Sequence, residues 1–387
     1  MRVLPIVLLL VLITTLFGGE EPRLTTLHQA GIGGYVGYRI PVIAATASGV
    51  LLTVCEARKD GFGDWAAIDL LLRRSTDGGV TWSEPIIMAK AGDPGTALAH
   101  NAVLIPSAGR TVHLLYCTGY ERCFHRRSDD DGATFAPPVE VTSAFAALKP
   151  QFAWNVIATG PGHGTRLRSG RLVVPCWLST GGKKHRPSAV TSLVSDDDGA
   201  TWTCGEILPT TAPNPSETVA VELTSGEVMF NLRTESPEHR RLVTRSKDGT
   251  SGWLPLIADP ALLESVCMAG LIRLDESNGN GRIAFANPDC LTYKDGKPGM
   301  SRERRNLTIR LSADDAKTWT HARVLEPDAA GYCDLAATPG GVIWCFYECG
   351  AVKGNIYHTS ELRVARFTTA WVEAGQRAPL LPSDEKP

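Results

Sequence analysis

The sequence predicts an all-β protein folded as a six-bladed β-propeller, and two interleaved repeats carry that prediction. The first repeat is an apolar strand, a small turn that contains glycine, and a second apolar strand. It occurs six times at intervals of 55 to 61 residues, with turn glycines at Gly49, Gly109, Gly170, Gly226, Gly281 and Gly341. Glycine supplies the positive φ that a tight hairpin needs. One such hairpin is ordinary, but six at near-constant spacing indicate a repeat architecture.

The second repeat has the pattern Ser-x-Asp-x-Gly-x-Thr-Trp and alternates with the first. Complete copies occupy residues 75–82 and 195–202, near-complete copies occupy 128–135 and 312–319, and a degenerate copy occupies 246–253. Aspartate and glycine favour a turn in which a side chain bonds its own backbone, and the closing aromatic ring can anchor that turn to the hydrophobic layer. We interpret these Asp-boxes as structural.

Hairpin and Asp-box together predict a blade of four antiparallel strands. Six blades closed in a ring hide the sheet edges that would otherwise invite aggregation. We therefore predict a signal peptide over residues 1–20, one propeller domain over 21–373 and a disordered tail over 374–387. Helical periodicity is weak throughout, and residues 259–269 are the best short candidate for a helix.

Composition and the N-terminus narrow the class of protein further. The net charge is −2, with 39 basic and 41 acidic residues, so no nucleic-acid partner is predicted. Arg2, the apolar run from Val3 to Phe17 and the small residues that follow resemble a secretory signal peptide, with an uncleaved anchor as the alternative. We expect a secreted or periplasmic monomer with no membrane contact beyond such an anchor.

The ten cysteines are too sparse for a disulfide scaffold in a chain of this size. Cys117 with Cys123, and Cys345 with Cys349, are candidate bridges, although sequence does not fix connectivity. Cys176 and Cys345 lie in strand-like runs, where a buried small hydrophobe is the plain alternative. Neither Cys-x-x-Cys nor His-x-x-x-His spacing occurs, so we expect no metal and no other cofactor.

The two ends of a hairpin lie together, opposite its turn. Residues just before a first strand or just after a second strand should therefore share one face of the propeller. That face is predicted to collect ionisable groups from distant parts of the chain, namely Arg39, Arg58, Asp60, Asp64, Glu217, Arg233, Arg302, Arg304, Arg305, Tyr332 and Glu348. Their convergence near the central channel predicts a functional site there.

Several motifs accompany the five Asp-boxes in a fixed order along the chain. They are Tyr38-Arg39-Ile40-Pro41, Glu217 to Leu223 leading to Phe230-Asn231-Leu232-Arg233, Arg304 to Ser312, and Gly331 to Leu335. Together they resemble the exo-α-sialidase (neuraminidase) family over nearly the whole chain. The resemblance implies a retaining glycoside hydrolase that releases terminal α-linked sialic acids from glycoproteins, glycolipids such as gangliosides, and oligosaccharides.

The resemblance implies that Arg39, Arg233 and Arg304 bind the carboxylate of the sugar. A guanidinium is always charged and presents a planar fork to a carboxylate, so three of them make an anion site without a metal. Arg305 is the alternative to Arg304, which is favoured by its four-residue offset from Thr308, the usual spacing in the family. The plain alternative for Arg233 or Arg304 is a solvated surface arginine.

By the same resemblance Tyr332 is the nucleophile, and Glu217 removes its phenolic proton. Sialic acid carries a carboxylate at its anomeric carbon, so a neutral phenol approaches that carbon without the repulsion that a carboxylate would meet. Asp64 matches the acid/base residue, with Asp60 as the rival. The plain alternatives are a core tyrosine and a salt-bridging Glu217.

Arg58 is similar to the family arginine near the N-acyl group of the sugar, and Glu348 to the carboxylate that orients Arg39. The chain departs from the family pattern at Pro215-Ser216, before Glu217, and at Cys333, where serine is common. Neither departure removes a catalytic group. Two further hypotheses remain: a trans-sialidase or a glycosidase for a related nonulosonic acid, and a non-catalytic propeller that binds acidic sugars.

Overall fold

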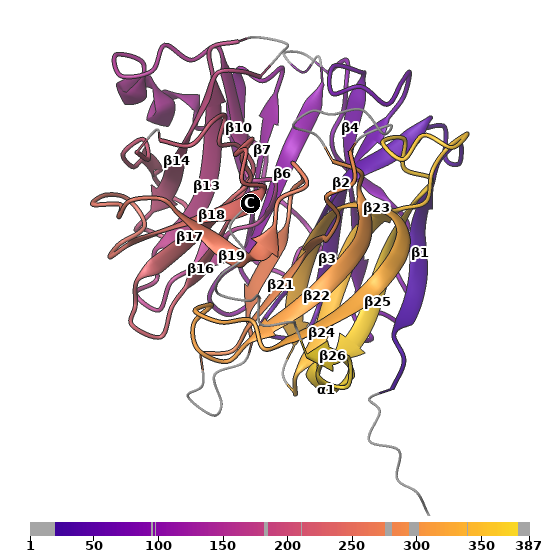
Figure 1. Cartoon of the computed structure of the whole chain (residues 1–387). Helices are drawn as coiled ribbons and strands as arrows, with labels where there is room; N and C mark the ends of the chain where they lie inside the picture. The colour runs from indigo at the N-terminus through magenta and orange to yellow at the C-terminus, as the bar shows by residue number, and fades with distance from the viewer. Residues whose placement is uncertain are drawn as a thin grey trace, which may run out of the picture.

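The computed structural model describes residues 20–377, except 94, 95, 97, 182–184, 210, 275–280, 294–301 and 339. These residues form mainly antiparallel sheets that mostly follow one another in chain order (Figure 1). The all-β prediction is therefore confirmed. The predicted signal peptide lies outside the described residues apart from Glu20. In the described part, no helix is long and apolar enough to span a membrane.

The first three sheets are formed by the N-terminal half of the chain. The first comprises β2 (Gly37–Ala45), β3 (Leu51–Arg58), β4 (Ile68–Ser75) and β5 (Ile86–Ala89). The second comprises β6 (Ala99–Pro106), β7 (Val112–Thr118), β8 (Arg122–Ser128), β9 (Val139–Glu140) and β11 (Gly162–His163). The third comprises β10 (Val156–Thr159), β12 (Thr165–Arg166), β13 (Leu172–Ser179), β14 (Ser188–Ser195) and β15 (Thr203–Cys204). A short 3-10 helix, η1 (Thr142–Leu148), follows β9.

The fourth sheet comprises β16 (Thr218–Glu222), β17 (Val228–Leu232), β18 (Arg240–Ser246) and β19 (Ile257–Leu263). The fifth and largest comprises β20 (Gly270–Arg273), β21 (Ile283–Pro288), β22 (Arg305–Ser312), β23 (His321–Thr338), β24 (Val342–Cys349), β25 (Glu361–Thr368), β26 (Gln376–Arg377) and β1 (Arg23–Gln29). A short helix, α1 (Thr369–Glu373), follows β25. Residues within β3, β7 and β13 are buried along their whole length, as strands inside a layered core require.

The largest sheet divides at β23, whose first half pairs with β22 and whose second half, from Ala330, pairs with β24. Counting the two halves separately would give six groups of strands, the number that the hairpin repeat predicts. The blade count of six stays a prediction. The group that contains β24 is completed by β1, which pairs antiparallel with β25. Figure 1 shows the indigo strand β1 beside the yellow-orange strand β25.

The Asp-boxes make the turns that the sequence predicts. In the first box, Asp77 accepts hydrogen bonds from Ser75 Oγ at 2.9 Å and from Thr81 Oγ1 at 2.6 Å. Hydrogen bonds from Thr81 lower the pKa of Asp77 to about 2. Equivalent aspartate–threonine bonds occur in the other boxes at Asp130, Asp197, Asp248 and Asp314. The closing Trp202, Trp253 and Trp319 are buried, so these boxes are anchors of the core.

Three expectations need correction or restriction. Residues 259–263 of the helix candidate 259–269 belong to strand β19, because this segment pairs antiparallel with β18. The segment from Ala374 is ordered as far as β26, which pairs with His321 and Ala322, and the rest of the predicted tail lies outside the described residues. All ten cysteines are free thiols, so the candidate bridges Cys117–Cys123 and Cys345–Cys349 are not formed.

Candidate active site

A pocket of about 260 Å³ gathers six of the predicted residues from distant parts of the chain. Its wall contains Arg39, Asp64, Glu217, Arg233, Arg304 and Tyr332. The remaining lining residues are Trp177, His185, Arg186, Ser188, Asn214, Ser216, Glu235, Val266 and Tyr357. The hairpin rule predicted that these six would lie on one face. Four of them lie within two residues of a strand end, namely Arg39, Glu217, Arg233 and Arg304. Asp64 lies on the loop between β3 and β4, and Tyr332 lies at the bulge inside β23.

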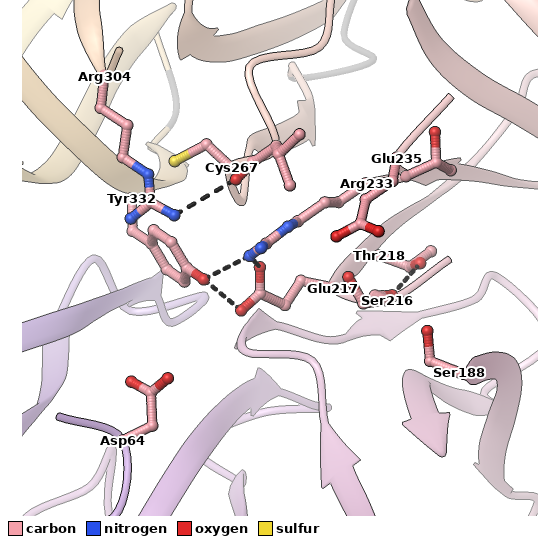
Figure 2. A network of polar contacts seen from close by, with 12 residues as sticks. Asp64, Ser188, Ser216, Glu217, Thr218, Arg233, Glu235, Cys267, Arg304 and Tyr332 are labelled. Carbon is pink, nitrogen blue, oxygen red and sulfur yellow. Dashed lines mark hydrogen bonds and ion pairs between the residues drawn. The ribbon is translucent and has the colours of Figure 1, made fainter. Parts of the chain in front are cut away.

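Tyr332 and Glu217 are in direct contact inside this pocket (Figure 2). The Tyr332 hydroxyl donates to Glu217 Oε1 at 2.5 Å and accepts from Arg233 Nη1 at 2.6 Å. Arg233 Nη1 also donates to the other oxygen of Glu217. Burial raises the pKa of the Tyr332 phenol, and it outweighs the opposing charge of Arg233. The phenol is therefore protonated in the ligand-free site, with a carboxylate in place to receive its proton.

Three guanidinium groups surround the ring of Tyr332. Their central carbons lie 5.1 Å (Arg39), 6.0 Å (Arg233) and 4.8 Å (Arg304) from the ring centroid. We call these three residues the arginine cluster. Positive charges so close together repel one another unless an anion or a carboxylate lies between them. The pocket is thus suited to a negatively charged ligand.

Arg39 is held from behind by Glu348, a buried residue of β24. Glu348 accepts from Arg39 Nε at 3.0 Å, and it also accepts the backbone N–H groups of Ile40 and Tyr332, each at 3.1 Å. Burial would raise the pKa of Glu348, but the charges of Arg39 and Arg304 outweigh it and lower that pKa. Glu348 does not line the pocket, so its contact is with Arg39.

Two β-bulges aim these side chains into the pocket. The β2–β3 register shifts between Arg39 and Val42, and the β23–β24 register shifts between Ala330 and Cys333. A bulge bends its strand and re-aims a side chain near a sheet end. Arg39 and Tyr332 each lie at such a shift, which the strand pattern alone did not reveal.

The structure distinguishes Arg304 from its neighbour. Arg304 is 8% exposed and lines the pocket, and its Nη2 donates to the Val266 carbonyl at 3.3 Å. In the described part of the chain no carboxylate pairs with Arg304. Arg305 instead lies outside the pocket, and its Nε donates to Glu303 at 2.9 Å. Arg304 is therefore the residue that completes the arginine cluster.

Asp64 lies on a loop between β3 and β4, away from Arg233 and Arg304 (Figure 2). Its side chain is 49% exposed and accepts from Arg58 Nη2 at 3.0 Å, while Arg39 Nη1 lies 3.7 Å away. Burial would raise the pKa of Asp64, but the charges of Arg58 and Arg39 outweigh it and hold that pKa at about 2. Asp60, the rival, does not line the pocket and accepts from the Ala67 backbone.

Arg58 occupies a different place from the other predicted residues. It is 1% exposed, does not line the pocket, and lies between Glu56 and Asp64, with its Nη2 donating to Glu56 at 2.7 Å. Its Nη1 donates to the Phe62 carbonyl. The geometry therefore assigns Arg58 a contact with the loop of Asp64, and its contact with substrate stays a prediction.

Sequence reasoning missed the aromatic and polar walls of the pocket. His185 packs against Tyr120 and Trp177, with ring centroids 4.6 and 5.2 Å apart. On another side Glu235 accepts from Arg186 Nε at 2.6 Å and from Asn214 Nδ2 at 2.7 Å. Apart from Trp177 in β13, these residues come from loops with no repeated motif, so no signal in the sequence identified them.

The arrangement combines three arginines suited to an anion, a phenol hydrogen-bonded to the Glu217 carboxylate, and a second carboxylate, that of Asp64, in the pocket wall. Within the residues that the structure describes, no group of three or more His, Cys, Asp or Glu side chains is arranged to hold a metal ion. The three arginines, the phenol beside its carboxylate and the second carboxylate are together suited to hold an acidic sugar and cleave the bond at its anomeric carbon.

Comparison with known proteins places the chain in a family. The model of the BNR repeat-like domain matches residues 63–345, which is most of the chain. The chain therefore belongs to the BNR repeat-like domain family. Its curated relatives include proteins named sialidases, the family that the ordered motifs resemble.

Two bacterial relatives illustrate the likeness. The sialidase of Micromonospora viridifaciens is 28% identical over 92% of this chain and 55% of its own length. The sialidase of Bacteroides fragilis is 27% identical over 85% of this chain and 63% of its own length. The chain thus spans a little over half of these curated relatives.

Solved structures agree on the fold. The Hadza microbial sialidase Hz136 has a TM-score of 0.74 at 23% identity, over 90% of this chain and 69% of that one. A leech intramolecular trans-sialidase has a TM-score of 0.72 at 17% identity, over 92% of this chain and 71% of that one. The sialidase-type propeller fold is therefore shared with both.

Proposed function

We propose that this protein is an exo-α-sialidase, a retaining glycoside hydrolase that releases terminal α-linked sialic acids from glycoconjugates. One observation carries the proposal: the Tyr332 hydroxyl lies 2.5 Å from Glu217 Oε1 while the arginine cluster surrounds its ring. A nucleophile and its base thus stand beside a site for the carboxylate that sialic acid carries at the reacting carbon.

The first step is binding of the sugar carboxylate by the arginine cluster. Arg304 has no carboxylate partner among the described residues, whereas Arg39 and Arg233 are already held by Glu348 and Glu217. A ligand carboxylate therefore supplies the missing negative charge. Because guanidinium groups can bind a carboxylate through two hydrogen bonds each, they also fix its orientation and place the anomeric carbon over Tyr332.

The second step is attack by Tyr332 on the anomeric carbon. The phenolic proton moves to Glu217 as the new carbon–oxygen bond forms and the glycosidic bond breaks. Charge that develops on the phenolic oxygen is stabilised by the hydrogen bond from Arg233. The raised pKa of Tyr332 makes this base necessary, because the free phenol does not ionise near neutral pH.

Asp64 supplies the proton for the leaving oxygen. In the ligand-free site its pKa is about 2, so the carboxyl is ionised at neutral pH. A substrate carboxylate bound to Arg39 offsets the positive charge beside Asp64, and a bound sugar displaces water from it. Both changes raise the pKa of Asp64 towards the value that a proton donor needs. In the second half of the reaction the Asp64 carboxylate takes a proton from water, and the water oxygen displaces Tyr332 from the anomeric carbon with net retention. Glu217 returns its proton to the phenolic oxygen as that bond breaks.

Hydrolysis of a fluorogenic sialic acid glycoside tests the proposal. We expect activity in the wild type and a loss of at least about 1,000-fold in kcat for Tyr332→Phe and Asp64→Ala, since each removes a group that acts in bond cleavage. Asp60→Ala is the matched control and should retain activity. Wild-type protein that binds sialic acid without cleaving any glycoside would identify the non-catalytic alternative, and full activity in Tyr332→Phe would exclude that nucleophile.

We also propose that the protein is exported, on the strength of the charged and apolar N-terminal segment. The residues concerned lie outside the described part of the chain. N-terminal sequencing of protein recovered from the natural source tests the idea. A mature chain that begins shortly after Phe17 supports cleavage, whereas a cytoplasmic protein that still begins at Met1 contradicts export.

A further inference from the structure

The turn between β19 and β20 contains a strained residue that touches the arginine cluster. Val266 has a φ of 60°, a conformation that is rare for a residue branched at Cβ. Its side chain lines the pocket, and its carbonyl accepts the hydrogen bond from Arg304. Such strain persists only where the surrounding structure enforces it. Something must therefore hold Val266 in this conformation.

Glu264 holds it. One carboxylate oxygen, Oε1, accepts the backbone N–H of Val266 at 2.7 Å and that of Cys267 at 3.1 Å. The other oxygen, Oε2, accepts from Arg241 Nη1 at 2.8 Å and from the Thr234 N–H at 3.3 Å. Thr234 directly follows Arg233, so one side chain connects the supports of two members of the arginine cluster.

Arg241 fixes Glu264 in turn. It is fully buried, Glu264 is 1% exposed, and Arg241 also donates to the Cys267 carbonyl at 3.0 Å and to Asn231 Oδ1 at 2.7 Å. A buried ion pair is weak evidence of a contribution to stability, because desolvation offsets most of the attraction. The geometry of this pair, with both partners bonded to the turn of Val266, points to a positioning role instead.

A similar arrangement, a strained residue whose N–H donates to a buried glutamate, occurs next to Arg39. Ile40 is also branched at Cβ and has a φ of 57°, and its N–H donates to the buried Glu348, which pairs with Arg39. Ile40, Cys267 and Met268 pack together against Tyr332 in one cluster. Two strained segments, each held by a buried glutamate, therefore meet at the proposed nucleophile.

We propose that Glu264 and Arg241 are positioning residues that hold the Val266 turn so that Arg304 is fixed for carboxylate binding. The proposal rests on the proposed function, because it assumes that Arg304 binds the carboxylate of the substrate. Neither residue lines the pocket. Both act through the backbone of Val266 and Cys267, and their effect should appear in substrate affinity rather than in the chemical step.

A double-mutant cycle tests this role. Glu264→Gln should raise the Kd for free N-acetylneuraminic acid and the KM for the fluorogenic glycoside by about tenfold, the size of one hydrogen bond to a charged group, and should change kcat much less. In an Arg304→Ala background the same substitution should change both by less than about twofold, because the residue it acts through is gone. Equal effects in both backgrounds, or no effect in the wild type, would overturn the proposal.

Two further variants keep the test decisive if Glu264→Gln folds poorly. Val266→Gly relieves the strain and keeps both the carbonyl and the hydrogen bonds to Glu264, so it should fold and leave KM near the wild-type value. In the Val266→Gly background Glu264→Gln should still raise KM, because nothing then holds the turn, and an unchanged KM in that double variant would contradict the proposal. Glu222→Gln is the matched control: Glu222 pairs with Arg168 at 3.1 Å outside this pocket, and its loss should leave KM unchanged. Wild-type protein that neither binds nor cleaves a sialoside would refute the proposed function itself.

Discussion

The two sides of the pocket are built differently. Arg39 is 8% exposed and Glu348 2% exposed, and both lie on strands whose bulges fix them. Asp64 lies on a loop, is 49% exposed, and is reached by Arg58 from behind. A carboxylate must be bound in one orientation, which favours buried partners. A proton donor must change its pKa when substrate arrives, which favours a group that substrate itself can cover.

The largest expected effect comes from removing Glu348 on the buried side of the pocket. Glu348→Ala should lower the free energy of unfolding by about 3–5 kcal/mol, because Arg39 would be left buried without its partner. Two backbone N–H groups, of Ile40 and Tyr332, would also lose their acceptor. Chemical denaturation measures the loss.

Glu140→Ala is the control for Glu348→Ala. Glu140 pairs with Arg122 at 2.6 Å, but about 40% of each side chain is exposed. Its loss should cost less than about 1 kcal/mol, as is usual for exposed ion pairs. Similar losses for the two variants would mean that the buried side is no more tightly built than the surface.

An intermediate effect separates two adjacent arginines. Arg304→Ala should raise KM for a sialoside by about 100-fold, because it removes charge-assisted hydrogen bonds to the carboxylate. Arg305→Ala should change KM by less than about twofold, since Arg305 pairs with Glu303 outside the pocket. Steady-state kinetics on both variants makes the comparison, and a larger effect at Arg305 would reverse the assignment.

The smallest expected effect concerns Asp64, on the exposed side of the pocket, and the pH dependence of the free energy of unfolding. The folded pKa of Asp64 is about 2, below the ordinary value, so its interactions stabilise the fold above about pH 4 and are lost as pH falls towards 2. Asp64→Asn has no ionisable carboxyl and therefore lacks these interactions. The difference in unfolding free energy between wild type and variant should therefore shrink between pH 5 and pH 2.

Because Asp64 is half exposed, that change should stay below about 1 kcal/mol. Urea denaturation at several pH values measures it. A difference that grows as pH falls would mean that Arg58 and Arg39 do not stabilise the ionised carboxyl.

The repeat analysis placed eleven ionisable residues on one face because hairpin ends must meet there, and six of them line the pocket. The spacing implied by the family resemblance favoured Arg304 over Arg305, and the burial of Arg304 agrees. What it could not predict depends on backbone conformation. A positive φ at Ile40 or Val266 leaves no sign in residue type, since branched residues normally avoid it.

Contacts between distant segments were equally hidden from the sequence. Glu264 and Arg241 belong to no recognised motif, and their pairing arises because β18 and the turn after β19 meet in the folded chain. The helix expected over 259–269 failed for a related reason. Tertiary pairing of β18 with β19 overrode a weak local pattern.

The pairing of β1 with β25 has a consequence for how the molecule is made. Arg23 lies opposite Arg366, so the first described strand finds its partner only after almost the whole chain has been synthesised. Contacts between such distant residues form slowly, because the intervening chain must be ordered first. During synthesis β1 has an unpaired edge, and an exposed edge is open to pairing with other chains. Pairing of β1 with β25 protects both strand edges in the finished protein. Until that pairing forms, the unfinished chain is most prone to aggregation through the open edge of β1.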